Sequence, residues 1–162
     1  MSFSAEQFRG LIDDTLRVFS EQINKPSLHT KDAVELLMMT AAQETHLGKY
    51  LKQIRGPALG VFQMEPRTYV DLFANYISHK TELHDALELW SAPNMPFDIK
   101  MRGCIPYQII IARLYYLRIP EALPSKSDGL DMAHYYKKYW NTKLGKATPM
   151  EAYRNYIKYC VV

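Results

Sequence analysis

Hydrophobic residues recur every three or four positions along the first part of the chain, the spacing that gives an α-helix one apolar face. The first such series covers residues 8–23, and Ser4 followed by Gln7 ahead of it has the pattern of a capping box. Pro26 ends this series because proline cannot continue a helix. A second helix is expected over residues 30–46, which contain the run VELLMMTAAQET.

The pattern changes over residues 50–64, where YLKQI and LGVFQM flank the turn-forming sequence RGPA. Such runs around glycine and proline are typical of a short β-hairpin or a structured loop. Pro66 then suits the first turn of a third helix. Further helices are expected over LHDALELW, MRGCIPYQIIIARLYYLRI and GLDMAHYYKKYW, with SAPNMPFD and PSKSDG as loops. The last helix begins at Thr148 and Pro149, where Glu151 completes a capping box.

Composition agrees with one mainly α-helical domain that covers residues 1–162. Hydrophobic residues make up 48% and charged residues 23% of the chain, as in soluble globular proteins. No apolar run approaches the roughly 20 residues that a membrane helix needs, so we expect no membrane insertion. The N-terminus lacks a basic segment followed by an apolar one, so no signal peptide is predicted.

Charge and cysteine content narrow the function classes further. The net charge of +3 is too small to indicate nucleic-acid binding. From His134 onward, six basic residues accompany a single acid, Glu151, and form either an attractive surface for an anionic polymer or a solvated helix face. Cys104 and Cys160 are expected to be free, buried thiols. The histidines have no metal-ligand spacing, so neither a metal nor another cofactor is predicted.

Glu44 is notable because it shares a helix face with apolar residues. Its neighbours three, seven and ten positions earlier are all apolar, and a helix repeats every 3.6 residues. Poor solvation and the negative end of the helix dipole both raise the pKa of a carboxyl group placed there. A carboxyl group that stays protonated near neutral pH is suited to general acid catalysis. Alternatively, Glu44 is a structural residue paired with Arg55 or Lys52.

The segment that follows has the residue types of a ligand-contacting loop. Gly56 and Gly60 permit tight backbone geometry and the close approach of a ligand. Gln63 lies between Phe62 and Met64, so on a strand its side chain points away from theirs. A glutamine offers both a donor and an acceptor, which suits the recognition of sugar hydroxyls or amides.

The sequences QETHLG and GVFQMEPRTY resemble two motifs of the soluble lytic transglycosylase and goose-type lysozyme superfamily. The longer stretch ETHLGKYLKQIRGPALGVFQMEPRTYVD is similar to small phage-encoded proteins of that kind. The resemblance implies a lysozyme-like fold, mainly helical, with a small β-hairpin beside a substrate cleft. It also implies cleavage of the β-1,4 bond between N-acetylmuramic acid (MurNAc) and N-acetylglucosamine (GlcNAc) in peptidoglycan.

The resemblance carries over to individual residues. Glu44 matches the catalytic acid, and Gly60 and Gln63 match the glycine and glutamine of the second motif. Thr45 keeps the hydroxyl of the serine that usually follows the acid. The third motif pairs an aromatic residue with asparagine, and Asn141 comes closest to it here.

Aromatic residues complete the expected substrate site, because their rings stack on the apolar faces of sugars. A tyrosine near the acid helps to orient it in this superfamily, and Tyr139 is the first choice for this role, with Tyr107 second. Phe62, beside the glutamine, joins the expected substrate-binding residues. One or two tyrosines or tryptophans of residues 135–140 are expected in the cleft wall. His46 is expected to be a surface or packing residue.

Glu65 separates two mechanisms. If Glu44 acts alone, it protonates the leaving oxygen and then helps the muramyl 6-hydroxyl to close a 1,6-anhydro ring, as lytic transglycosylases do. Goose-type lysozymes carry an aspartate at the position of Glu65, and if Glu65 activates water, the chain is an inverting muramidase. Alternatively, Glu65 precedes Pro66 and only favours the start of the third helix through its charge.

The expected partners are therefore peptidoglycan glycan strands and, for a phage protein, other virion proteins. Without a signal peptide, the chain is expected in the phage virion or in the host cytoplasm, acting at the bacterial cell wall. A non-catalytic alternative keeps the same fold, because a fold does not dictate an activity. The chain is then a structural or sugar-binding module of the virion.

Overall fold

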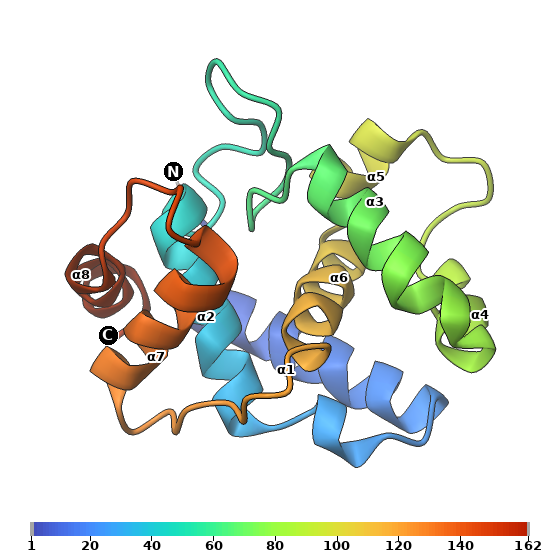
Figure 1. Cartoon of the computed structure of the whole chain (residues 1–162), viewed down its shortest axis with the longest axis horizontal. Helices are drawn as coiled ribbons and strands as arrows, with labels where there is room; N and C mark the ends of the chain where they lie inside the picture. Colours follow the sequence, from blue (N-terminus) through green and yellow to red (C-terminus); the bar gives the residue numbers. More distant parts are fainter. Residues whose placement is uncertain (1, 162) are drawn as a thin grey trace.

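The computed structural model describes residues 2–161, which form a bundle of helices around a central helix (Figure 1). The chain is mainly α-helical, as predicted, and the described residues contain no extended β-strand. The helices are α1 (Ala5–Gln22), α2 (Lys31–Thr45), α3 (Pro66–Asn75), α4 (Thr81–Glu88), α5 (Phe97–Gly103), α6 (Ile105–Leu117), α7 (Gly129–Tyr136) and α8 (Pro149–Cys160). Shorter turns are the 3₁₀-helices η1 (Pro26–Leu28) and η2 (Ile77–His79) and the π-helix η3 (Lys137–Asn141).

The helix caps explain where several of these elements begin. The Ser4 hydroxyl accepts a hydrogen bond from the Gln7 backbone at 3.4 Å, and the Thr30 hydroxyl accepts one from Ala33 at 3.1 Å. These contacts satisfy backbone N–H groups that have no partner inside the helix. At α8, the complete capping box of Thr148 with Glu151 is present, which confirms the prediction.

Helix α6 lies at the centre of the molecule, and α1, α2 and α5 pack against it. Its residues 107–116 are all buried. A helix that is apolar on most sides belongs in a core, and the two polar residues buried on α6, Gln108 and Arg113, both form hydrogen bonds there. The predicted central helix is therefore present, but it is shorter than expected.

The predicted helix over MRGCIPYQIIIARLYYLRI is in fact two helices, α5 and α6, separated at Cys104. Pro106 lies in the first turn of α6, where its missing N–H leaves no hydrogen bond unmade. In one continuous helix, Pro106 would have no N–H to bond to the Arg102 backbone oxygen and its ring would clash with that carbonyl group, so the helix breaks at Cys104. Cys104 is half-buried and Cys160 is buried, and both are free thiols.

The prediction of a β-hairpin over residues 50–64 is not confirmed. Leu59 forms isolated antiparallel bridges with Lys52 on one side and Met64 on the other. Between Leu59 and Met64, residues 60–63 form a tight turn, in which Gly60 and Gln63 have positive φ angles of 81° and 51°. The segment is therefore a structured loop, and Figure 1 shows it extending from the helices in cyan and green.

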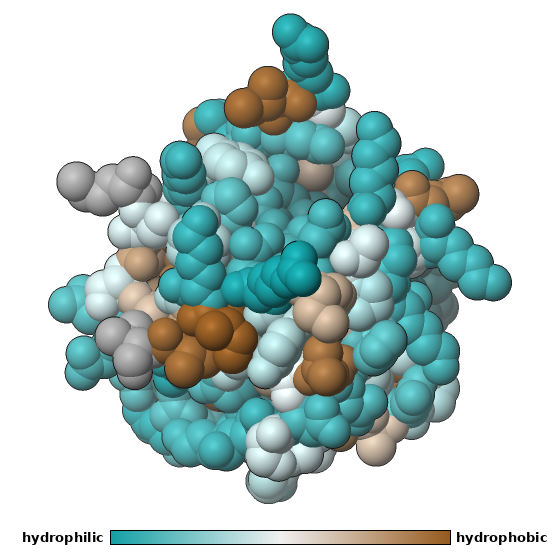
Figure 2. Space-filling model, turned by 90° about the vertical axis from the view of Figure 1, so that its left-hand side faces the viewer, coloured by the Kyte–Doolittle hydropathy of each residue, from teal (hydrophilic) through white to brown (hydrophobic). Residues whose placement is uncertain are grey.

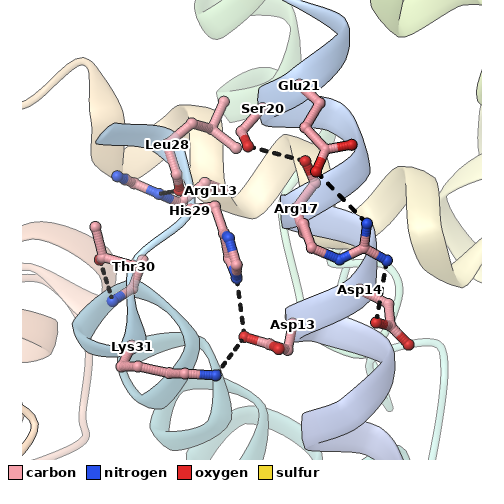
Figure 3. Close-up of polar contacts among 11 residues, drawn as sticks. Asp13, Asp14, Arg17, Ser20, Glu21, Leu28, His29, Thr30, Lys31 and Arg113 are labelled. Carbon is pink, nitrogen blue, oxygen red and sulfur yellow. Dashed lines mark hydrogen bonds and ion pairs between the residues drawn. The ribbon is translucent and has the colours of Figure 1, made fainter. Parts of the chain in front are cut away.

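The start of the chain is tied to α6 by a polar network between α1, η1 and α2 (Figure 3). Asp13 on α1 accepts hydrogen bonds from His29 at 2.9 Å and Lys31 at 3.0 Å, and both contacts lower its pKa. Arg113, a buried residue of α6, donates to the backbone oxygen of Leu28 at 2.7 Å. These contacts fix the turn before α2, and with it the direction in which α2 runs.

The last third of the chain covers α2. Helix α8 packs against α2 and α7, and all three lie together on the left of Figure 1. Figure 2 shows that this side of the molecule is largely hydrophilic, with separate hydrophobic patches. Five of the six lysines and arginines that follow His134 are exposed: Lys138, Lys143, Lys146, Arg154 and Lys158. Lys137, the sixth, is half-buried. Within residues 2–161, no helix combines the length and the apolar character needed to cross a membrane.

Candidate active site

Glu44 lies in the last turn of α2, where the buried stripe of that helix meets the covering segments. The residues three, seven and ten positions before it are all buried, as the helical period predicts. Its own side chain is half-buried. His46 caps α2 in the left-handed conformation, with a φ of 51°, and turns the chain away into the loop. The carboxyl group is therefore held at the edge of the core.

Tyrosines from two other segments contact Glu44. The hydroxyl of Tyr136, at the end of α7, donates a hydrogen bond of 2.5 Å to Glu44 Oε1. The hydroxyl of Tyr50, in the loop, donates one of 2.8 Å to the backbone oxygen of Glu44. Tyr136 is fully buried, so this bond has little competition from water.

Burial raises the pKa of Glu44 to about 7, although the hydrogen bond from Tyr136 opposes the rise. The pKa rises because poor solvation destabilises the charged carboxylate more than the neutral acid. Among the described residues, no lysine or arginine forms an ion pair with Glu44. Arg55 and Lys52, the alternative partners suggested by the sequence, are exposed on the loop. Glu44 is therefore a carboxylic acid whose polar partner is neutral.

The tyrosine that contacts the acid is Tyr136, and the predictions of Tyr139 and Tyr107 are wrong. The Tyr139 hydroxyl hydrogen-bonds to Glu121 instead. The Tyr107 hydroxyl lies 2.6 Å from that of Tyr69, in the core of the molecule. In a regular helix, Tyr139 follows Tyr136 on the same face, but the chain widens into the π-helix η3 directly after Tyr136. That change of helix type turns Tyr139 away from α2.

Thr45 and Phe62 have structural positions rather than exposed ones. The fully buried Thr45 hydroxyl donates to the Val61 backbone oxygen at 2.7 Å and accepts from the Gly48 backbone at 2.8 Å. It thus joins the end of α2 to the loop. Phe62 is only 3% exposed, and its ring packs near those of Phe8 and Trp140. The prediction that these two residues bind substrate is corrected accordingly.

Gly60 and Gln63 lie together in the turn of the loop. The Gln63 side chain donates to the Gly60 backbone oxygen at 3.0 Å, and the two residues also share a backbone hydrogen bond of 3.1 Å. A Cβ atom at Gly60 would lie 2.3 Å from Gln108 Oε1 and from the Met101 backbone oxygen, so only glycine fits there. Gly60 is therefore a packing residue, and Gln63, half-buried, braces the turn.

Asn141 follows Tyr136 by five residues. It ends the π-helix and is half-buried, and its side-chain oxygen accepts a hydrogen bond of 2.7 Å from Lys137 Nζ. A Cβ atom at Gly145 would lie 2.2 Å from the same oxygen, so the following loop passes close to the amide. The contacts of Asn141 are thus with its own segment of the chain.

Glu65 precedes α3 as its N-cap residue, and its backbone oxygen accepts bonds from Thr68 and Tyr69. Its carboxylate forms an ion pair of 2.6 Å with Arg67. Glu65 therefore stands at the start of α3, as in the helix-start alternative, and its carboxylate is paired with a residue of the same helix. Glu65 and Glu44 are not joined by any contact.

The remaining candidates are the histidines and the possible metal ligands of residues 2–161. No group of three or more histidine, cysteine, aspartate or glutamate side chains is placed to hold a metal ion there. The His46 ring stacks on that of Tyr159 with centroids 4.7 Å apart, so it is a packing residue, as predicted. Burial lowers the pKa of His46, and the nearby Lys49 and Lys158 lower it further.

Sequence reasoning found Glu44 but missed Tyr136 as its partner. One signal pointed to it: Tyr136 continues the buried stripe of Met132 and Ala133 at helical spacing. The stripe on α7 and the stripe on α2 are both buried, and packing one against the other brings Tyr136 to Glu44. No residue pattern in the sequence predicts that η3 is a π-helix.

Comparisons of the chain with family models, with curated proteins and with solved structures give no match. The function is therefore inferred from the chemistry of the site and from the motif resemblance described above.

Proposed function

We propose that the chain is a peptidoglycan-cleaving enzyme with a lysozyme-like fold, in which Glu44 is the general acid at the β-1,4 bond between MurNAc and GlcNAc. The observation that carries the proposal is the placement of Glu44 at the end of the buried face of α2, with the hydroxyl of Tyr136 bonded to its carboxyl group. Its pKa of about 7 keeps a large share of the group protonated at neutral pH. The resemblance of QETHLG and GVFQMEPRTY to the superfamily motifs supports the choice of substrate.

The contact with Tyr136 indicates how Glu44 would act. Tyr136 donates to Oε1, so the acidic proton belongs on Oε2. In the proposed reaction, Oε2 gives this proton to the glycosidic oxygen as the C1–O bond breaks, and GlcNAc leaves with a free hydroxyl. The Glu44 carboxylate then takes the proton of the muramyl 6-hydroxyl, whose oxygen bonds to C1. A 1,6-anhydro end forms, Glu44 regains its proton and no water is consumed.

The ion pair of Glu65 with Arg67 favours this single-carboxylate mechanism over an inverting hydrolysis. A general base for water needs a carboxylate across the sugar from the acid and free to accept a proton. The mass of the products separates the two reactions. Purified peptidoglycan should release muropeptides whose MurNAc ends are lighter by one water molecule than hydrolysed ends. Hydrated ends would instead assign Glu65 or another base to water, and no released product would favour a non-catalytic virion module.

Tyr136→Phe is expected to move the pH dependence of the reaction. The hydrogen bond from Tyr136 stabilises the Glu44 carboxylate, so its loss raises the pKa of Glu44 above 7. A charge-assisted hydrogen bond of this kind corresponds to about one pH unit. The midpoint of the alkaline fall in activity should move upward by that amount in a pH–rate profile.

Tyr156→Phe is the matched control for this variant. Tyr156 is also buried and donates a hydrogen bond of 2.6 Å to a carboxylate, that of Glu35 on the other side of α2. The same chemical change at Tyr156 should leave the midpoint where it is. Equal shifts in the two variants would mean that the profile reports a general loss of packing.

A further inference from the structure

The two loops beside the candidate active site carry only positive charge. Residues 46–64, which follow α2, and residues 142–148, which lead into α8, contain five lysines and arginines and no aspartate or glutamate. The rest of the chain has 15 basic and 17 acidic residues, so the net charge of +3 does not show this local excess. We call these five residues the basic rim: Lys49, Lys52, Arg55, Lys143 and Lys146.

The charges of the basic rim are not neutralised within the described part of the chain. All five side chains are exposed. None of them forms an ion pair among residues 2–161, whereas seven of the other lysines and arginines do. Ile54 and Leu144, which lie next to rim residues in the two loops, are 80% and 92% exposed. The tips of both loops therefore stand away from the core, where a ligand can meet them.

The acidic residues that follow the two loops in the sequence have other partners. Glu65 forms its ion pair of 2.6 Å with Arg67. The Glu151 carboxylate accepts a hydrogen bond of 2.8 Å from the Thr148 backbone in the capping box of α8. Neither carboxylate forms an ion pair with the basic rim.

The first loop is bonded directly to the last turn of α2, which carries Glu44. The Lys49 backbone donates a hydrogen bond of 2.8 Å to the Thr45 backbone oxygen. The Tyr50 hydroxyl donates one of 2.8 Å to the backbone oxygen of Glu44 itself. The rim residues of this loop are therefore attached beside the candidate acid.

The second loop approaches the same end of α2 from the other side. Tyr136 contacts the Glu44 carboxyl group, and its neighbour Lys137 donates a hydrogen bond of 2.9 Å to the Gly145 backbone oxygen. Figure 1 shows both loops at the upper end of α2, the first in cyan and green and the second in red. Glu44 thus lies at a helix end that has a basic loop on each side.

The position of the basic rim indicates which anion it meets. Lysine binds carboxylates as a compact point charge and does not require a fixed geometry. In peptidoglycan, the lactyl group of MurNAc carries a short stem peptide with free carboxylates. This peptide is attached to the sugar whose glycosidic bond Glu44 would protonate, so a bound MurNAc brings the carboxylates to the side of α2 where the two loops lie.

We propose that the basic rim binds the carboxylates of the stem peptide, so that the substrate is peptide-bearing glycan rather than the bare glycan strand. This inference rests on the proposed function, which brings MurNAc to Glu44. Each exposed charge contributes little by itself, but several charges of one sign around a site attract an oppositely charged substrate together. A long polyanion with a charge on every unit requires a longer basic track, and the chain outside the two loops has an excess of acids.

The test compares the binding of two glycan probes in the Glu44→Gln background, in which the proposed acid is absent and the strands stay intact. The probes are fluorescently labelled soluble glycan strands, either with their stem peptides or after an amidase has removed them. Fluorescence anisotropy gives the Kd of each probe. The peptide-bearing strands should bind about tenfold more tightly. Added salt should reduce this difference, because it screens exposed charges.

Replacing three rim lysines by glutamine should remove the preference. Binding of the peptide-bearing strands should weaken about tenfold, while binding of the peptide-free strands stays the same. Replacing the same lysines by arginine keeps the charge and should keep the affinity. A control variant removes three exposed lysines that lie outside the two loops and form no ion pair within residues 2–161, and it should bind both probes normally. The rim variant is Lys52→Gln, Lys143→Gln and Lys146→Gln, and the control is Lys25→Gln, Lys80→Gln and Lys126→Gln.

Three results would overturn the proposal and leave the proposed function in place. They are equal Kd values for the two probes, equal losses of binding in the rim and control variants, and tighter binding of inorganic polyphosphate than of the peptide-bearing strands. The last result would assign the rim to phosphate polymers. If the native chain cleaves neither strand, the proposed function fails, but peptide-dependent binding that is lost in the rim variant would still establish the rim as a binding site for acidic peptides.

Discussion

Glu44→Gln should reduce the rate of peptidoglycan cleavage by about three orders of magnitude, because general acid catalysis contributes a factor of roughly 10²–10⁴. Glutamine has nearly the same shape and can still accept the hydrogen bond from Tyr136, so the fold should be preserved. It has no proton to give to the glycosidic oxygen. The release of soluble muropeptides from purified peptidoglycan measures the rate, and circular dichroism verifies the fold.

Glu65→Gln is the matched control for this prediction. It makes the same chemical change in a carboxylate that is bonded to Arg67 at the start of α3. If Glu44 acts alone, Glu65→Gln should keep most of the activity. Loss of activity in both variants would support the inverting hydrolase, and full activity in Glu44→Gln would refute the proposed function.

Glu44→Gln should also make the protein more stable at alkaline pH than the native chain. The pKa of Glu44 is about 7 in the folded protein, compared with its ordinary value of 4.5. Below pH 4.5 the group is protonated in both the folded and the unfolded state, and it makes no difference to stability. As the pH rises from 4.5 to 7, the unfolded state loses this proton before the folded state does, and the native chain loses stability. Above pH 7 the penalty is complete, at up to about 3 kcal/mol.

Urea denaturation of both chains at pH 4 and pH 8 measures this effect. The difference in the free energy of unfolding between Glu44→Gln and the native chain should be larger at pH 8, by up to about 3 kcal/mol. Stability of this kind is often exchanged for activity at sites that hold a strained or poorly solvated group. A difference that does not change with pH would mean that Glu44 has an ordinary pKa in the folded protein.

Much of the helical structure was predictable from local patterns. The Thr30 cap, the Thr148–Glu151 capping box and the proline at the start of α3 each act within one turn of helix, so the sequence nearby is enough to recognise them. The hairpin prediction is not confirmed, because a strand depends on hydrogen bonds to a partner strand and not on neighbouring residues alone. The loop over residues 50–64 makes only the bridges of Leu59 to Lys52 and to Met64.

The site was predictable only in part. The position of Glu44 on the buried stripe of α2 follows from the period of a single helix, and so does its poor solvation. Thr45, Phe62 and Gly60 were expected at a substrate surface, but their side chains or backbone pack inside the protein. Residues next to a reactive group in the sequence often hold that group in place. A motif alone does not show whether such a residue binds substrate or only positions the reactive group.

The sequence by itself determined the mainly helical class of fold, the starts of several helices and the apolar helix face that carries Glu44. These features depend on residues within a turn or two of each other, whose spacing is visible in the chain. Only the tertiary structure decided which tyrosine meets Glu44, since Tyr136 lies 92 residues away and reaches it through the packing of α7 on α2. The π-helix after Tyr136 also changes which side chains share a face, and the Tyr139 hydroxyl contacts Glu121 instead of Glu44.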